Sequence, residues 1–135
     1  MKTRIAIRIA ALVFGLIIIA AVVIANLGYG ESFWPIISYT PNADKVGHIG
    51  IFGIMGFLSN LALPNFRIRH LPRLVTAITF FLFVLVSLEE ISQAFIPSRV
   101  CDVFDWLADV AGLAIGQIAA TVLSRFLPKQ ETSNT

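Results

Sequence analysis

The sequence has few charged residues, which make up only 13% of its 135 positions. A soluble domain carries about 25% charged residues, and about half of its residues are apolar. In this chain 57% of the residues are hydrophobic and the mean hydropathy is +0.84. The composition therefore excludes an ordinary soluble domain. It predicts a small integral membrane protein that forms one transmembrane domain over residues 1–135.

Cysteine and histidine are also scarce. Cys101 is the only cysteine, which excludes a disulfide within the chain. His48 lies among scattered acidic residues without the ligand spacing of a zinc site, so we expect no metal and no cofactor. The formal net charge is only +2. In a membrane protein such an excess reflects topology, so we expect no nucleic-acid partner.

Four apolar stretches are long enough to cross a bilayer, whose hydrocarbon core of about 30 Å takes roughly 20 helical residues. They cover residues 5–27, about 44–63, about 74–95 and about 103–127. Pro64 and Pro72 bracket the connection between the second and third stretches, and Pro97 ends the third, because proline breaks a helix. The first stretch is favoured as a retained helix over a cleaved signal peptide, because its apolar core is long and no small-x-small cleavage site follows. The sequence predicts an all-α polytopic bundle of four transmembrane helices.

The basic residues indicate how this bundle is oriented. Eight of the ten fall on one side: Lys2, Arg4, Arg8, Arg67, Arg69, Arg73, Arg125 and Lys129. Seven of the eight acidic residues fall on or near the other side. Because Lys and Arg stay on the cytoplasmic side, we expect a multi-pass membrane protein with both termini and the middle loop in the cytoplasm.

Glycine is concentrated in two of the stretches. Gly47, Gly50, Gly53 and Gly56 follow one another at every third position, and Gly112-x-x-x-Gly116 lies in the last stretch. Small residues let helices approach closely in a membrane, where van der Waals packing drives association. We therefore expect the second and fourth stretches to pack together. Packing within the monomer is favoured, and a homodimer seam is the alternative.

Polar residues gather at the outer ends of the last three stretches. They are Asp44, Lys45 and His48; Glu89, Glu90 and Gln93; and Asp102, Asp105 and Asp109, with Arg99 in the last connection. The three aspartates of the last stretch have i, i+3, i+7 spacing, which keeps them on one side of a helix. The sequence predicts that three helices direct these groups into one pocket at the outer leaflet of the lipid bilayer.

Depth divides the acidic residues of this pocket into two groups. Asp102 and Asp105 lie near a helix start, where acids cap backbone donors and favour the helix dipole. Glu89, Glu90 and Asp109 lie roughly 5–9 Å below the outer edge by the helical rise per residue. An unpaired charge at a helix centre costs about 2.5–3.5 kcal/mol, so we expect partners for these three.

Two ion pairs are expected, one of Arg99 with Glu89 or Glu90 and one of His48 with Asp105 or Asp109. The alternative to a binding site is an ion-pair network that only stabilises the fold. Such a network would contain similar numbers of acidic and basic residues, whereas acidic residues are in excess here. The excess of acids indicates shared protons, a bound cation, or a cationic or polyhydroxyl head group. His48 and Glu90 are the candidates for proton transfer, and the sequence leaves open whether the protein is an enzyme.

Two blocks of sequence resemble the VanZ-like family of small bacterial membrane proteins. They are Asp44-Lys45-x-x-His48-x-x-x-Phe52 and Glu89-Glu90-x-x-Gln93-x-x-Ile96-Pro97-x-Arg99-x-x-Asp102-x-x-Asp105-x-x-x-Asp109-x-x-Gly112-x-x-x-Gly116. The family often has asparagine where this chain has Asp109. The resemblance implies a multi-pass protein of the bacterial inner membrane and so of the cell envelope. The family's namesake is associated with low-level resistance to the glycopeptide teicoplanin.

Two functions follow as hypotheses. In the first, the protein binds or modifies a lipid-linked or glycolipid head group at the outer leaflet, and Arg99 holds a phosphate or carboxylate. In the second, it is a non-enzymatic membrane module whose charged cluster only fastens helices together or docks a partner. A transporter is a weaker idea, because acids confined to one leaflet leave no polar route across the membrane.

Overall fold

The computed structural model describes residues 2–33, 35, 40, 42–64 and 75–126. Within them the chain forms four long helices and one short helix, and no strand. The long helices are α1 (Lys2–Asn26), α4 (Ala43–Ala62), α5 (Ala77–Gln93) and α6 (Val103–Phe126); α2 (Gly30–Phe33) follows α1. The all-α prediction is confirmed, and each long helix coincides with one of the four apolar stretches.

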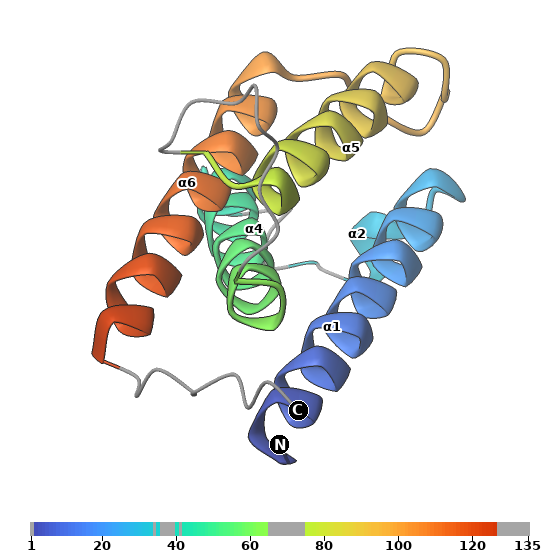
Figure 1. The fold of residues 1–135 in the computed structure, drawn as a ribbon. Helices are drawn as coiled ribbons and strands as arrows, with labels where there is room; N and C mark the ends of the chain where they lie inside the picture. The colour runs from blue at the N-terminus through green and yellow to red at the C-terminus, as the bar shows by residue number, and fades with distance from the viewer. Residues whose placement is uncertain (1, 34, 36–39, 41, 65–74, 127–135) are drawn as a thin grey trace.

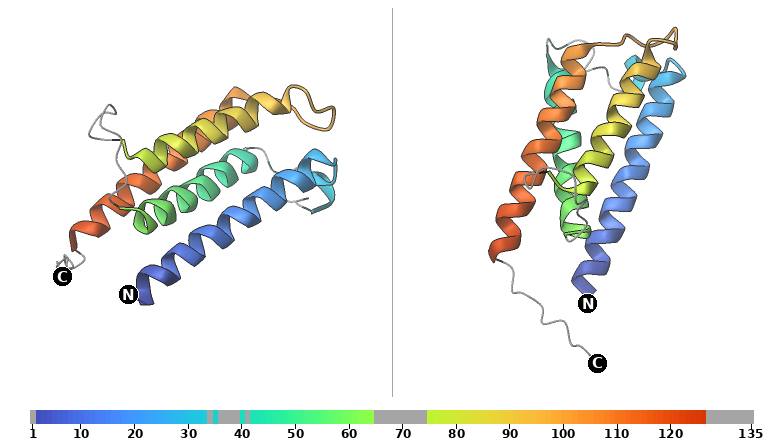
Figure 2. Two further views of the ribbon diagram at one scale, coloured as in Figure 1. Left: turned by 45° about the vertical axis from the view of Figure 1, so that its right-hand side comes forward. Right: turned by 45° about the horizontal axis from the view of Figure 1, so that its top comes forward.

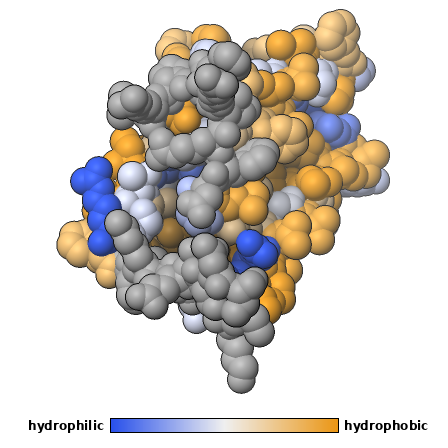
Figure 3. Space-filling view, in the orientation of Figure 1, coloured by the Kyte–Doolittle hydropathy of each residue, from blue (hydrophilic) through white to orange (hydrophobic). Residues whose placement is uncertain are grey.

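Helices α1, α4 and α6 are long and apolar enough to cross a membrane. Helix α5 has 17 residues, which is about 26 Å at 1.5 Å per residue and close to the thickness of a bilayer core. The predicted start of this stretch at residue 74 lies outside the described residues. Apolar side chains cover much of the surface (Figure 3), and Leu12 and Leu16 of α1 are 69% and 65% exposed. Such a surface suits a helical membrane bundle.

Helix α4 occupies the middle of the bundle. It packs most extensively against α6 and also contacts α1, while α5 lies against α6 and α4 (Figure 1). Successive long helices run in alternating directions (Figure 2). The start of α4, the end of α5 and the start of α6 therefore lie at one end of the bundle, and the start of α1 and the end of α6 lie at the other.

The contact between α4 and α6 depends on glycine. A Cβ atom on Gly112 would lie 2.6 Å from the carbonyl oxygen of Ile49, and one on Gly116 would collide with the carbonyl oxygen of Gly53. Across the same seam, a Cβ atom on Gly56 would lie 3.0 Å from the carbonyl oxygen of Leu113. The expected close packing of the second and fourth stretches is thus confirmed, and it occurs within the monomer.

Arg8, the only charged residue of the first apolar stretch, is accounted for by a contact with α4. Its Nε–H donates to the carbonyl oxygen of Ala62 over 3.4 Å. Ala62 ends α4, and the last carbonyl groups of a helix have no partner within it and carry partial negative charge. The Arg8 guanidinium therefore attaches α1 to the end of α4.

A polar network that the sequence analysis did not anticipate joins α4, α5 and α6 at this same end. Thr76 caps α5 by accepting a hydrogen bond from the Thr79 backbone N–H at 3.2 Å. Its hydroxyl lies 2.6 Å from Asn60 Oδ1, and its backbone N–H donates to Gln117 Oε1 at 3.1 Å. Asn60 Nδ2 also donates to the Gly56 carbonyl oxygen and to Thr79 Oγ1, at 2.8 and 2.9 Å. Because Asn60 is buried, these bonds hold the three helices in register.

The glycine seam predicts a position-dependent effect of adding one methyl group. Gly112→Ala and Gly116→Ala should each lower the free energy of unfolding by about 1–3 kcal/mol, because the methyl group meets α4 backbone. Gly50→Ala is the matched control, since a Cβ atom there meets nothing within 4 Å. Unfolding in an SDS and mild-detergent titration measures the difference. Equal stabilities for all three variants would contradict the seam.

Candidate functional site

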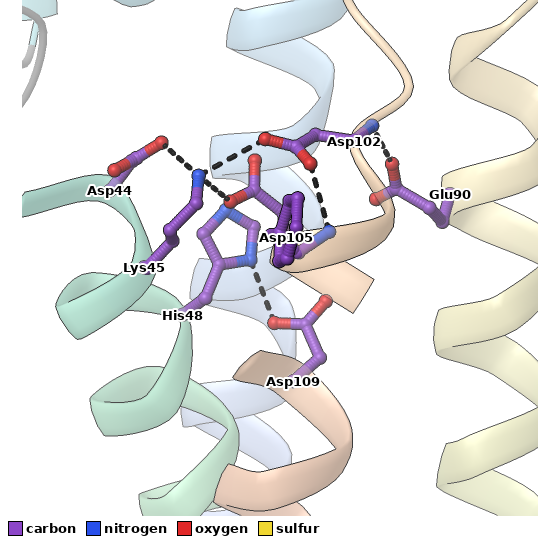
Figure 4. A network of polar contacts seen from close by, with 8 residues as sticks. Asp44, Lys45, His48, Glu90, Asp102, Asp105 and Asp109 are labelled. Carbon is purple, nitrogen blue, oxygen red and sulfur yellow. Dashed lines mark hydrogen bonds and ion pairs between the residues drawn. The ribbon is translucent and has the colours of Figure 1, made fainter. Parts of the chain in front are cut away.

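Lys45, in the first turn of α4, stands at the centre of an ion-pair cluster (Figure 4). Its Nζ lies 3.0 Å from Asp44 Oδ2, 3.1 Å from Asp102 Oδ2 and 2.9 Å from Asp105 Oδ1. An ammonium group has three hydrogens to donate, so each carboxylate receives one of them. The cluster connects the start of α4 to the start of α6 and places three negative charges around one positive charge.

Asp102 combines this ion pair with a capping role, as its position at a helix start predicts. Its Oδ1 accepts a hydrogen bond from the Phe104 backbone N–H at 2.8 Å, which caps the first turn of α6. The Phe104 N–H and the Lys45 ammonium hold the pKa of the Asp102 carboxyl below its usual value of 3.8. This carboxylate therefore stabilises the fold above pH 3.8, and its contribution is lost as the pH falls through the lowered pKa.

His48 and Asp109 form a second pair one turn deeper. His48 Nδ1 lies 2.7 Å from Asp109 Oδ1, which confirms one of the two expected pairings of His48. Asp109 is 1% exposed, and the ring of Phe52 stacks on the imidazole with centroids 6.4 Å apart. When Asp109 is ionised, the Nδ1–H of His48 donates to it. The other ring nitrogen points towards the side chains of Lys45 and Asp105 (Figure 4).

Glu90 brings the end of α5 into the same cluster. Its Oε1 accepts a hydrogen bond from the Asp102 backbone N–H at 2.7 Å (Figure 4). The residue is 4% exposed, and its Oε2 is buried without a hydrogen-bond partner among the described residues. The thiol of Cys101 lies beside the carboxyl group but is only a weak donor.

Glu89 and Gln93 form a neighbouring pair within α5. Gln93 Nε2 donates to Glu89 Oε2 over 2.8 Å, as their i, i+4 spacing allows. Gln93 is buried, and Glu89 Oε1 is buried with no hydrogen-bond partner in the described ranges.

The expected pairing of Arg99 with Glu89 or Glu90 is wrong, since the described residues contain no such ion pair. The oxygens that remain, Glu89 Oε1 and Glu90 Oε2, are buried, and the half-buried Arg99 side chain in the connection after α5 makes no ion pair with them. The backbone N–H of Arg99 instead donates to the Ile96 carbonyl in the turn between α5 and α6. The side chain is half-buried at the same end of the bundle as the other predicted site residues.

A groove of about 310 Å³ runs beside this cluster, between α5 and α6. Its lining consists of Ser87, Glu90, Ile91, Cys101, Val103 and Trp106. Trp106, which the sequence suggested as an interfacial anchor, is half-buried and donates through Nε1–H to Ser87 Oγ at 3.0 Å. The Ser87 hydroxyl donates to the Phe83 carbonyl oxygen one turn back, as expected for a serine within a helix.

With this geometry in view, comparison with known proteins identifies the family. The family model described as VanZ/LLP1 matches residues 6–124, which include all the predicted site residues. The chain belongs to the VanZ/LLP1 family. No curated protein and no solved structure matches it.

The site has the chemistry of a carboxylate-rich pocket. Across the described ranges, no group of three or more histidine, cysteine, aspartate or glutamate residues is placed to hold a metal ion. The cluster offers hydrogen-bond acceptors and one imidazole whose second nitrogen is directed into the cluster. Such a set binds hydroxyl or ammonium donors and allows proton transfer at the imidazole.

Removing the central cation should destabilise the fold. Lys45→Gln leaves three aspartates facing one another, so we expect the variant to unfold at a lower SDS fraction than the wild type. Adding Asp105→Asn should restore part of the lost stability because it removes one of the repelling charges. Arg125→Gln, at an exposed position near the end of α6, is the control. If Lys45→Gln and Arg125→Gln unfolded at the same SDS fraction, the prediction would be wrong and the ion-pair cluster would not stabilise the fold.

Proposed function

We propose that this VanZ-family protein is a multi-pass protein of the bacterial inner membrane, with its polar cluster at the outer leaflet. The support is the separation of charge along the bundle. Arg4, Arg8 and Arg125 lie at the end where α1 starts and α6 ends. The acidic cluster lies at the opposite end, and basic residues favour the cytoplasmic side. In this orientation the start of α1 and the end of α6 face the cytoplasm.

The function that this site supports best is binding of a lipid-linked or glycolipid head group from the outer leaflet. The observation that carries the proposal is that ionisable groups from three helices gather beside a groove at one end of the bundle. They are the half-buried His48 and the buried Glu90 and Asp109. Ionisable residues within membrane spans are costly and generally mark functional sites. A lipid is the natural ligand for a groove whose remaining lining is largely apolar.

The individual residues suit different parts of such a ligand. Glu89 and Glu90 each have one buried carboxylate oxygen without a hydrogen-bond partner in the described part of the chain, so they suit hydroxyl or ammonium donors. Arg99, in the turn that ends α5, is the candidate partner for a phosphate, because a guanidinium binds phosphate through two parallel hydrogen bonds. His48 and Glu90 are the candidates for proton transfer if the head group is also modified.

The association of the family's namesake with glycopeptide resistance fits this proposal. Lipid-linked wall precursors are exposed at the outer leaflet, where the proposed site lies. A protein that holds such a lipid would change how much of it an extracellular glycopeptide reaches. Reduced susceptibility to teicoplanin is therefore a consequence of the proposed binding and not a separate activity.

A structural clasp is the second candidate function, and the Lys45 cluster favours it. All three hydrogens of the ammonium are used by aspartates of α4 and α6, which is the pattern of a helix fastener. The exchanged pair Lys45→Asp with Asp105→Lys separates the two functions. A clasp predicts that the exchange restores both stability and phenotype, whereas a binding site predicts recovered stability without lipid binding.

The orientation is testable through the native cysteine. Cys101 is exposed in the connection between α5 and α6, and it is the only cysteine of the chain. A membrane-impermeant maleimide should therefore label it in intact spheroplasts. A Cys101→Ser variant carrying Ser124→Cys, at an exposed position near the other end of α6, should be labelled only after permeabilisation. The reverse pattern would show that the cluster faces the cytoplasm.

Lipid binding itself is testable by mass spectrometry of lipids that copurify with the protein. The wild type should retain a lipid-linked or glycolipid species, and Asp109→Asn, His48→Gln and Arg99→Gln should each retain at least about tenfold less, the scale of one charge-assisted hydrogen bond. Arg125→Gln should retain the wild-type amount. Unchanged lipid retention in all three site variants, with normal unfolding curves, would refute the proposed function.

A further inference from the structure

The groove between α5 and α6 contains an acidic group whose hydrogen bonding is incomplete. Glu90 lines this groove, is 4% exposed, and uses Oε1 to accept the Asp102 backbone N–H at 2.7 Å. Its Oε2 is buried and has no hydrogen-bond partner within the described ranges. A buried acceptor without a partner is unfavourable, so the groove has a place for a hydrogen-bond donor from outside the chain.

Among the other polar groups of the groove, the Cys101 thiol beside Glu90 is only a weak donor, and Trp106 and Ser87 donate elsewhere. The indole N–H of Trp106 donates to Ser87 Oγ at 3.0 Å, and the Ser87 hydroxyl donates to the Phe83 carbonyl oxygen at 2.8 Å. Ile91 and Val103 add apolar side chains to the lining. The groove thus combines an apolar wall with the carboxyl group of Glu90, whose Oε2 is buried and has no partner among the described residues. This combination suits an amphiphile with a donor group next to its apolar part.

The charge around Glu90 favours a cationic donor over a neutral or anionic one. Six carboxylates gather at this end of the bundle: Asp44, Glu89, Glu90, Asp102, Asp105 and Asp109. The described basic groups that they contact are Lys45 and His48, and three of the carboxylates share Lys45. An ammonium group therefore gains from this surplus of negative charge, and an anionic head group is repelled.

We propose that the α5–α6 groove binds a phospholipid whose head group ends in a primary ammonium, which donates to Glu90 Oε2 while its apolar chains lie against Ile91, Val103 and Trp106. A quaternary ammonium is excluded as an equal ligand because it carries no N–H to donate. This inference goes beyond the proposed function, since it assigns to the groove a phospholipid in addition to the lipid-linked or glycolipid head group proposed for the polar cluster.

Two lipids that differ only at the nitrogen test the proposal. The full-length protein is placed in nanodiscs of phosphatidylcholine, and native mass spectrometry measures competition by phosphatidylethanolamine and phosphatidylglycerol with the same acyl chains. Phosphatidylethanolamine should bind about tenfold or more tightly than phosphatidylcholine, the scale of a charge-assisted hydrogen bond. Phosphatidylglycerol should bind least. Equal affinity for phosphatidylethanolamine and phosphatidylcholine would overturn the proposal.

Variants assign the preference to the groove. Glu90→Gln keeps an oxygen for the Asp102 backbone but removes the charge, so the preference for phosphatidylethanolamine should disappear. Glu131→Gln is the control. It makes the same chemical change at a glutamate outside the described residues, and this variant should keep the preference for phosphatidylethanolamine. Val103→Trp fills the groove from an exposed position and should lower binding of phosphatidylethanolamine even if Glu90→Gln fails to fold. A preference that survives both groove variants would overturn the proposal.

The failure of this inference can be told apart from failure of the proposed function. If the wild type binds the two zwitterionic lipids equally but still copurifies a lipid whose retention depends on Asp109, the ammonium proposal alone is wrong. If the wild type retains no lipid of any class, both fail. Alkylation of Cys101, which lines the groove, gives a second readout, because phosphatidylethanolamine should slow it and phosphatidylcholine should not.

Discussion

The close approach of α4 and α6 is the constraint on which the rest of this structure depends. Gly112 and Gly116 bring the two backbones so near that a methyl group at either position would collide with α4. In a bilayer, where no hydrophobic effect drives helices together, such contact supplies much of the packing energy. The seam also fixes register, and register decides which side chains meet at the end of the bundle. The polar cluster is therefore a consequence of the glycine seam.

This register places unlike charges opposite each other at increasing depth. Lys45 meets aspartates of the first turns, and one turn deeper His48 meets Asp109. Helix α5 completes the arrangement through Glu90, whose carboxylate accepts the backbone N–H of Asp102 just before α6. The cluster is a fastener and a polar site at once, because most of its carboxylates are paired while Glu89 and Glu90 each keep one buried oxygen without a described partner.

Most of the bundle was predictable from the sequence, because apolar stretches of membrane length and glycine spacing are strong local signals. The pairing of His48 with either Asp105 or Asp109 was predictable because all three lie near the starts of helices expected to pack together, and the structure selects Asp109. The partner of Glu90 was not predictable, because a backbone N–H carries no signature in the side-chain pattern. The network around Asn60 was missed for a related reason, since uncharged polar residues near helix ends resemble ordinary capping residues.

The central claim, that the α4–α6 seam sets a single polar cluster in register, is tested most directly by a distance across that cluster. Solid-state NMR of the protein in bilayers, with ¹⁵N-histidine and ¹³C-aspartate labels and the substitution His70→Gln, isolates the imidazole of His48. The account predicts a through-space contact between its Nδ1 and the carboxyl carbon of Asp109, lost in Asp109→Asn. A resolved imidazole signal with no carboxyl contact in the wild-type cluster would contradict it.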